Sequence, residues 1–256
     1  MKTKFTVLLA ILALACWATA ASASEVFYGG IIGNRFALAD FFLAGNTLTV
    51  TLANTADYDV DEPDDVLTGV GFNTTHTLKP VSANLGNSTV FYAPIVNNVG
   101  EGWQYQSWQY QSGINFHGKN SGISAAELGS AVELPIFGPN GNFLNPGVPL
   151  DGIDYGILSY ITEPATGNGG ITNDGPLIKY VVQFILTADP DFSLSELGDT
   201  VVLQYGTELT DPFSTGGILY AIDVPVPAVP LPPSVLLMGS GLLGLGLLGF
   251  RKKTKG

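Results

Sequence analysis

Polar and apolar residues alternate along much of the middle of this chain. The stretch 47–52 reads TLTVTL, in which every second side chain is apolar. Because successive side chains of a strand point to opposite faces, this alternation predicts a half-buried strand. Similar patterns, some of them more continuously apolar, predict further strands at 67–72, 89–92, 157–161, 177–186, 200–205 and 218–222.

Turn-forming residues separate these predicted strands. Clusters of Gly, Pro, Asn and Asp lie at 44–46, 138–141, 166–170 and 173–176. Such clusters favour tight turns, because these residues tolerate or impose turn geometry. One short segment, Ser124 to Leu128, favours a helix. Many short strands joined by such turns predict an all-β fold, either an antiparallel sandwich or a jelly-roll-like domain.

The N-terminus departs from the strand pattern. Two lysines precede an uncharged apolar run over 5–15, and the small residues Ala-Ser-Ala follow at 21–23. A short basic region, an apolar run and a small-x-small site are typical of a secretory signal peptide. We expect residues 1–23 to direct export and to be removed by signal peptidase. The mature chain then contains no cysteine, because the single cysteine is Cys16.

The C-terminus consists of three successive segments. Residues 224–234 are rich in proline, which favours an extended linker because proline fixes φ and lacks an amide hydrogen. Residues 235–250 contain no charged side chain, and a helix of that length spans about 24 Å, a little less than a hydrocarbon core of about 30 Å. The basic tail 251–256 should stay cytoplasmic. This predicts a transmembrane helix that holds residues 24–223 outside.

This arrangement resembles the PEP-CTERM sorting signal. The matching residues are Val229, Pro230, Leu231 and Pro232 of a VPLP-type motif, Gly239, Gly241 and Gly244 of the membrane helix, and Arg251, Lys252 and Lys253 of the basic stop. The resemblance implies an exosortase as partner, a membrane transpeptidase that would remove the tail near the proline motif. The protein would be membrane-anchored only transiently, and would then reach the surface or matrix of a bacterium that makes exopolysaccharide. A permanently anchored membrane protein facing the periplasm is the alternative.

A five-residue sequence, WQYQS, is repeated directly over 103–112. An odd period moves equivalent side chains to opposite faces of a strand, which favours a loop or hairpin with partly exposed rings. A second hypothesis is a carbohydrate-binding module, in which the exopolysaccharide stacks on exposed rings and bonds to the glutamines. Its residues would be Trp103, Tyr105, Trp108 and Tyr110.

The charge balance is acidic, with 22 acidic residues against 10 basic ones and a net charge of −12. This excludes a general nucleic-acid binder, because phosphates would be repelled. Six acids fall within 57–65, and such close carboxylates must be solvated or neutralised by cations. A solvated acidic loop is one interpretation. The other is calcium coordinated by Asp57, Asp59, Asp61 and Asp65, in a loop that lacks the glycine of an EF-hand.

Catalytic motifs are not evident in the sequence. Only His76 and His117 could supply an imidazole base, and neither lies in a metal-ligand motif. Two of the many acids could form a glycosidase pair, but nothing in their spacing indicates one. We therefore expect a non-enzymatic exported protein with a structural or adhesive role in the exopolysaccharide or biofilm, without a cofactor unless calcium is bound.

Overall fold

The computed structural model describes residues 23–86, 88–92, 98–109, 115–128, 137, 141–144, 150, 152–162, 171 and 175–218. Contacts divide the chain into two units, Met1–Tyr220 and Ala221–Gly256, and all the described residues belong to the first. The predicted signal peptide, apart from Ala23, and the predicted segments 224–234, 235–250 and 251–256 lie outside the described residues. Within the described ranges, no helix has the length and hydropathy needed to cross a membrane.

Strands dominate the described part of the chain, and three short 3-10 helices accompany them. The strands are β1 (Ala23–Ile32), β2 (Arg35–Ala44), β3 (Thr47–Asn54), β4 (Leu67–Phe72), β5 (Lys79–Asn84), β6 (Thr89–Phe91), β7 (Gln104–Ser107), β8 (Ser121–Ser124), β9 (Ile157–Leu158), β10 (Leu177–Lys179), β11 (Val181–Thr187), β12 (Thr200–Tyr205) and β13 (Phe213–Ile218). The 3-10 helices are η1 (Pro63–Asp65), η2 (Gly100–Gly102) and η3 (Leu194–Leu197). The all-β class predicted from the strand pattern is confirmed.

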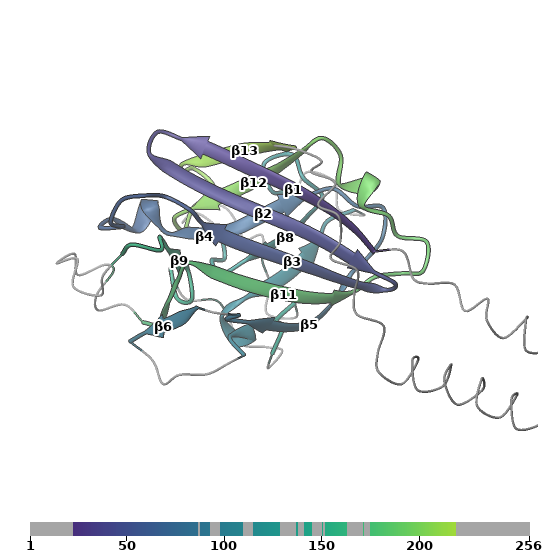
Figure 1. The fold of residues 1–256 in the computed structure, drawn as a ribbon, viewed down its shortest axis with the longest axis horizontal. Coiled ribbons are helices and arrows are strands. Elements are labelled where there is room, and N and C mark those ends of the chain that lie inside the picture. Colours follow the sequence, from purple (N-terminus) through teal and green to yellow (C-terminus); the bar gives the residue numbers. More distant parts are fainter. Residues whose placement is uncertain are drawn as a thin grey trace, which may run out of the picture. The chain divides into compact units, whose positions relative to one another are not determined.

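All the described strands join one sheet (Figure 1). Its order is β5-β11-β3-β2-β1-β13-β12-β4-β9-β10-β6, with β8 paired to β4 and β7 paired to β8. The β9–β10 pair is parallel, so the sheet is mixed rather than purely antiparallel. Strands β10 and β11 lie near opposite ends of this order, yet only Tyr180 separates them in the chain. The sheet therefore curls back on itself.

Two hairpins, β1–β2 and β2–β3, join three neighbouring strands of this sheet. Strand β2 pairs with β1 along its whole length, from Ile32↔Arg35 to Ala23↔Ala44. Every second side chain of β2 is buried, and those between are half-buried. Gly45 has a φ of 59° in the tight turn to β3, a conformation that glycine adopts without steric cost.

Aromatic rings from four strands fill the interior. Tyr28 of β1 contacts Phe41 of β2 edge-on, with ring centroids 5.6 Å apart. Phe41 contacts Phe72 of β4 in the same way at 5.4 Å. Phe72 in turn stacks on Tyr105 of β7 at 6.4 Å. Each ring of this size contributes about 2 kcal/mol by leaving water, so this chain of contacts holds the two sides of the curled sheet together.

Two local predictions are wrong. Residues 124–128 form no helix, because Ser124 ends β8 and its Oγ bonds both the carbonyl and the amide of Ala126, at 2.8 Å and 3.0 Å. Such a local bond offers the backbone an alternative to the helix. The predicted strand 177–186 is broken at Tyr180, whose φ is 82°. Of the predicted strand 218–222 only Ile218 is described, at the end of β13.

Candidate functional site

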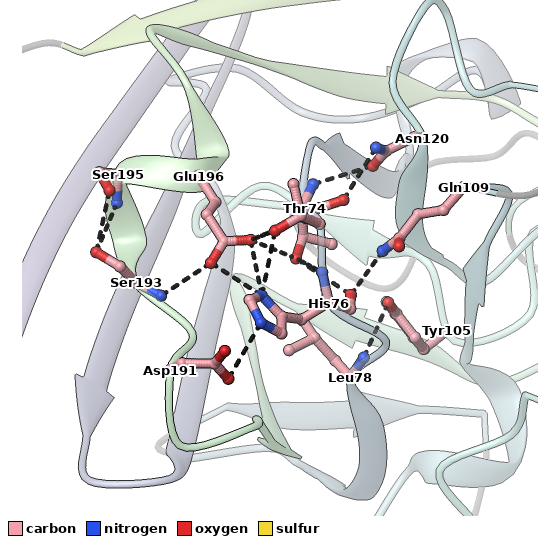
Figure 2. Close-up of polar contacts among 11 residues, drawn as sticks. Thr74, His76, Leu78, Tyr105, Gln109, Asn120, Asp191, Ser193, Ser195 and Glu196 are labelled. Carbon is pink, nitrogen blue, oxygen red and sulfur yellow. Dashed lines mark hydrogen bonds and ion pairs between the residues drawn. The ribbon is translucent and has the colours of Figure 1, made fainter.

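A histidine and two carboxylates meet where two distant segments touch (Figure 2). His76 lies in the loop between β4 and β5, Glu196 in η3, and Asp191 in the segment that leads into η3. Nδ1 of His76 is 3.0 Å from both carboxylate oxygens of Glu196. Nε2 of the same ring is 3.2 Å from Oδ1 of Asp191. We call these three residues the histidine clasp.

Glu196 receives most of the hydrogen bonds of the clasp. Its Oε2 accepts from the amide of Thr75 at 2.8 Å and from the Thr75 hydroxyl at 2.6 Å. Its Oε1 accepts from the amide of Ser193 at 3.1 Å, as part of a capping box that begins η3. Partial burial acts to raise the pKa of Glu196, but the bonds from Thr75, His76 and Ser193 outweigh it and lower the pKa to about 2.

His76 has a carboxylate at each ring nitrogen. The hydrogen bond to Glu196 raises the pKa of His76, desolvation opposes this rise, and Asp191 adds to it. This environment favours the imidazolium form, in which both nitrogens donate and neither can accept a proton. The clasp is suited to join two loops while the ring is charged.

The duplicated WQYQS segment supports the loop that carries His76. Tyr105, from the first copy, accepts at its hydroxyl a hydrogen bond of 3.3 Å from the amide of Leu78. Gln109, from the second copy, donates from Nε2 to the carbonyl of His76 at 2.7 Å. Figure 2 shows both side chains pointing to this loop from the opposite side to Glu196. The repeat therefore has a structural role that its sequence did not indicate.

The carbohydrate platform predicted on this repeat is wrong for the three rings that the structure describes. Trp103, Tyr105 and Trp108 are 0%, 5% and 3% exposed. Trp103 packs edge-on against Phe184 at 4.8 Å between ring centroids. Because the rings lie in the core, their faces cannot meet a polysaccharide at the surface. Tyr110, the fourth predicted ring, lies outside the described residues.

Arg35 of β2 ties the end of the acidic stretch 57–65 to the sheet. Nη2 of Arg35 lies 2.6 Å from Oδ1 of Asp65, the fourth predicted calcium ligand. The other three, Asp57, Asp59 and Asp61, are exposed. In the described part of the chain, no group of three or more His, Cys, Asp or Glu side chains is arranged to hold a metal ion. Calcium binding stays a prediction, and an unfolding midpoint that millimolar calcium leaves unchanged would remove it.

His117 lies far along the sequence from the clasp, in the turn before β8. Its Nε2 is 2.6 Å from Oε1 of Gln204, and since that oxygen can only accept, Nε2 carries the proton. The ring stacks on Phe213 with centroids 4.0 Å apart. Burial lowers the pKa of His117, and the bond to Gln204 partly opposes this.

The sorting residues predicted at 229–232, in the membrane helix and in the basic tail lie outside the described residues. No family model matches the chain, and comparison with curated proteins and with solved structures finds no match either. The function must therefore be inferred from the sequence and from the geometry of the β-domain.

Proposed function

We propose that this chain is an exported bacterial surface or extracellular-matrix protein whose C-terminal sorting signal is processed by an exosortase. The observation that carries the proposal is the order of three segments at the end of the chain: a proline motif at 229–232, an uncharged apolar stretch over 235–250, and a basic cluster at 251–253. An apolar segment followed by basic residues stops in the membrane with its basic end in the cytoplasm. The proline motif then lies where a membrane transpeptidase can reach it.

The extent of the β-domain is compatible with removal of both ends. Strand β1 begins at Ala23 and β13 ends at Ile218, and the two strands pair side by side. The described apolar core runs from Tyr28 to Tyr205. Cleavage after residue 23 and near 229–232 would leave these core residues in the product. We infer that the product is a sandwich-like or jelly-roll-like ectodomain.

A structural or adhesive role fits this domain better than catalysis. Each ring nitrogen of His76 contacts a carboxylate, and Nε2 of His117 donates to Oε1 of Gln204. Both histidines thus stabilise loops of the fold. In this proposal the domain acts through its surface, in the exopolysaccharide or biofilm around the cell.

A pair of variants in the producing bacterium tests the sorting proposal. Replacing Pro230 and Pro232 by alanine removes the motif, whereas replacing Pro225 and Pro227 removes the same number of prolines from the linker alone. We expect the first variant to stay in the membrane fraction at full length. The second should be processed and released like the wild type. Equal processing of both variants would contradict the proposal, and an uncut wild-type chain would favour a permanent anchor.

A further inference from the structure

Two exposed tyrosines form a corner on the surface of the β-domain. The side chains of Tyr160 and Tyr180 are 49% and 42% exposed. Their ring centroids lie 6.1 Å apart and the ring planes are inclined by 76°. Tyr160 follows β9, and Tyr180 separates β10 from β11. We call these two residues the tyrosine corner.

The backbone holds Tyr180 in a conformation that a tyrosine rarely adopts. Its φ of 82° lies in the left-handed region, where a bulky side chain costs free energy and glycine does not. Two ladder bonds fix it there: its amide donates to the carbonyl of Leu158 at 2.9 Å, and its carbonyl accepts from the amide of Asn54 at 3.0 Å. A strained residue that carries a large exposed ring is a reason to look for a function of that ring.

Buried hydrogen bonds fix the segment that carries Tyr160. The hydroxyl of Ser159 donates to the carbonyl of Tyr58 at 2.6 Å and lies 2.7 Å from the hydroxyl of Thr162. The Thr162 hydroxyl accepts from the amide of Val60 at 3.0 Å. Ser159 and Thr162 are both fully buried. Neither tyrosine therefore needs a new backbone conformation to bind a ligand, which keeps the entropic cost of binding low.

We propose that the tyrosine corner is a stacking site for pyranose units of an uncharged polysaccharide. The C–H groups of a pyranose carry partial positive charge, and they pack against the negative face of an aromatic ring. Because the two ring planes are inclined by 76°, a sugar stacked on one tyrosine ring would contact the edge or the hydroxyl of the other ring. Each phenol can both donate to and accept from sugar hydroxyls.

The acidic balance of the ectodomain disfavours acidic polymers at the corner, even with Lys179 next to Tyr180 in the chain. The hydrogen bonds of Ser159 and Thr162 join the segment that carries Tyr160 to Tyr58 and Val60, which lie within the acidic stretch 57–65. Asp57 and Asp61 in that stretch are exposed, and residues 24–223 as a whole contain 22 acidic side chains against four basic ones. A polyanionic polysaccharide would be repelled. The site concerns the ectodomain alone and does not depend on C-terminal processing.

Affinity electrophoresis of the full chain in a non-ionic detergent tests this proposal. The probes are hydroxyethyl cellulose, dextran and galactomannan, which are uncharged, and alginate, which is a polyanion. We expect at least one uncharged polymer to retard the protein and alginate to leave it unaffected. No retardation by any of the three uncharged polymers would overturn the proposal, as would retardation by alginate alone.

Two glycine variants show whether the tyrosine corner causes the retardation by uncharged polymers. Tyr180→Gly removes the ring and suits the φ of 82°, so the protein should keep an unfolding midpoint close to that of the wild type while its affinity for the polymer falls about tenfold or more. Tyr92→Gly is the matched control, because Tyr92 is also exposed, at 45%, and also has a positive φ, 63°. Tyr92 follows Phe91, the last residue of β6. Phe91 pairs with Leu177, which lies at the opposite end of β10 from Tyr180. Unchanged affinity in Tyr180→Gly, or an equal loss in Tyr92→Gly, would overturn the proposal.

Discussion

Both carboxylate oxygens of Glu196 lie 3.0 Å from Nδ1 of His76, although 120 residues separate the two in the chain. This contact joins the loop after β4 to the segment that contains η3. Because Thr75 and Ser193 donate to the same carboxylate, removal of Glu196 would take the acceptor from both of these donors as well as from the ring. The consequences for stability can be measured.

Stability should depend on pH through the histidine clasp, with a maximum on the acid side of neutrality. The pKa of His76 is raised above 6.5, so its contribution is complete below about pH 6.5 and is lost as the pH rises through the folded value. The pKa of Glu196 is lowered from 4.5 to about 2, so its contribution is complete above pH 4.5 and is lost as the pH falls towards 2. Urea unfolding at a series of pH values measures both changes.

The variant His76→Gln isolates the alkaline part of this profile. The glutamine side chain does not titrate, so the variant should show a smaller fall in unfolding free energy between pH 6 and 9 than the wild type does. Other groups, Asp40 among them, titrate in the same range in both proteins and cancel in the comparison. If the unfolding free energy fell equally between pH 6 and 9 in the two proteins, the carboxylates would not raise the pKa of His76.

Asp40→Asn should stabilise the protein at alkaline pH. Burial, and to a smaller extent the charge of Glu25, raises the pKa of Asp40 from 3.8 to about 7. Ionisation of Asp40 therefore destabilises the fold progressively between pH 4 and 7 and fully above pH 7. The amide removes this cost, and we expect a gain of about 1 kcal/mol at pH 8, allowing for partial solvation. At pH 4, where Asp40 is protonated in the folded state, wild type and variant should differ little.

Trp103→Ala should cost about 3–5 kcal/mol in unfolding free energy, because it opens a cavity in the core. Trp103 is fully buried and contacts Phe184. Ile31→Ala is the control, since Ile31 is 64% exposed and surface substitutions usually change stability by less than about 0.5 kcal/mol. Similar midpoints for the two variants in chemical unfolding would mean that Trp103 is not part of the core.

Gly122→Ala should destabilise the fold through a clash with one ring. A Cβ at Gly122 of β8 would lie 2.6 Å from Cδ1 of Phe116, and one at Gly71 of the neighbouring β4 would lie 2.8 Å from the same atom. Overpacking of this kind costs about 1–3 kcal/mol. Gly217→Ala in β13 is the matched control, because its Cβ would have its nearest contact at 4.0 Å. Equal midpoints in thermal unfolding would contradict the packing of Phe116 on these glycines.

The strands that were predicted from sequence are those with a clear pattern of apolar residues. Segments 67–72 and 200–205 coincide with β4 and β12, and 47–52 lies within β3. Strand β2 was not predicted, because its sequence, RFALADFFLA, is apolar on both faces and shows little alternation. Tyr180 was predicted inside a continuous strand, since nothing in its residue type indicates a positive φ.

The candidate site was less predictable than the fold. His76 meets Glu196 only because the sheet brings β4 and the segment before β12 together, and local sequence contains no sign of that pairing. The sequence predicts partly exposed rings in the WQYQS repeat, because its period of five residues does not match the two-residue period of a strand. In the structure the first copy contributes β7, and Trp103 and Trp108 are buried in different apolar clusters.

The most direct test of the proposed sorting is the intact mass of this protein, isolated from the envelope and the medium of the bacterium that produces it. Processing at both ends predicts a mature chain that begins after residue 23 and ends at or near 229–232. A mass that still includes Lys255 and Gly256, found in every fraction, would show that the C-terminal segment is retained and would contradict the account.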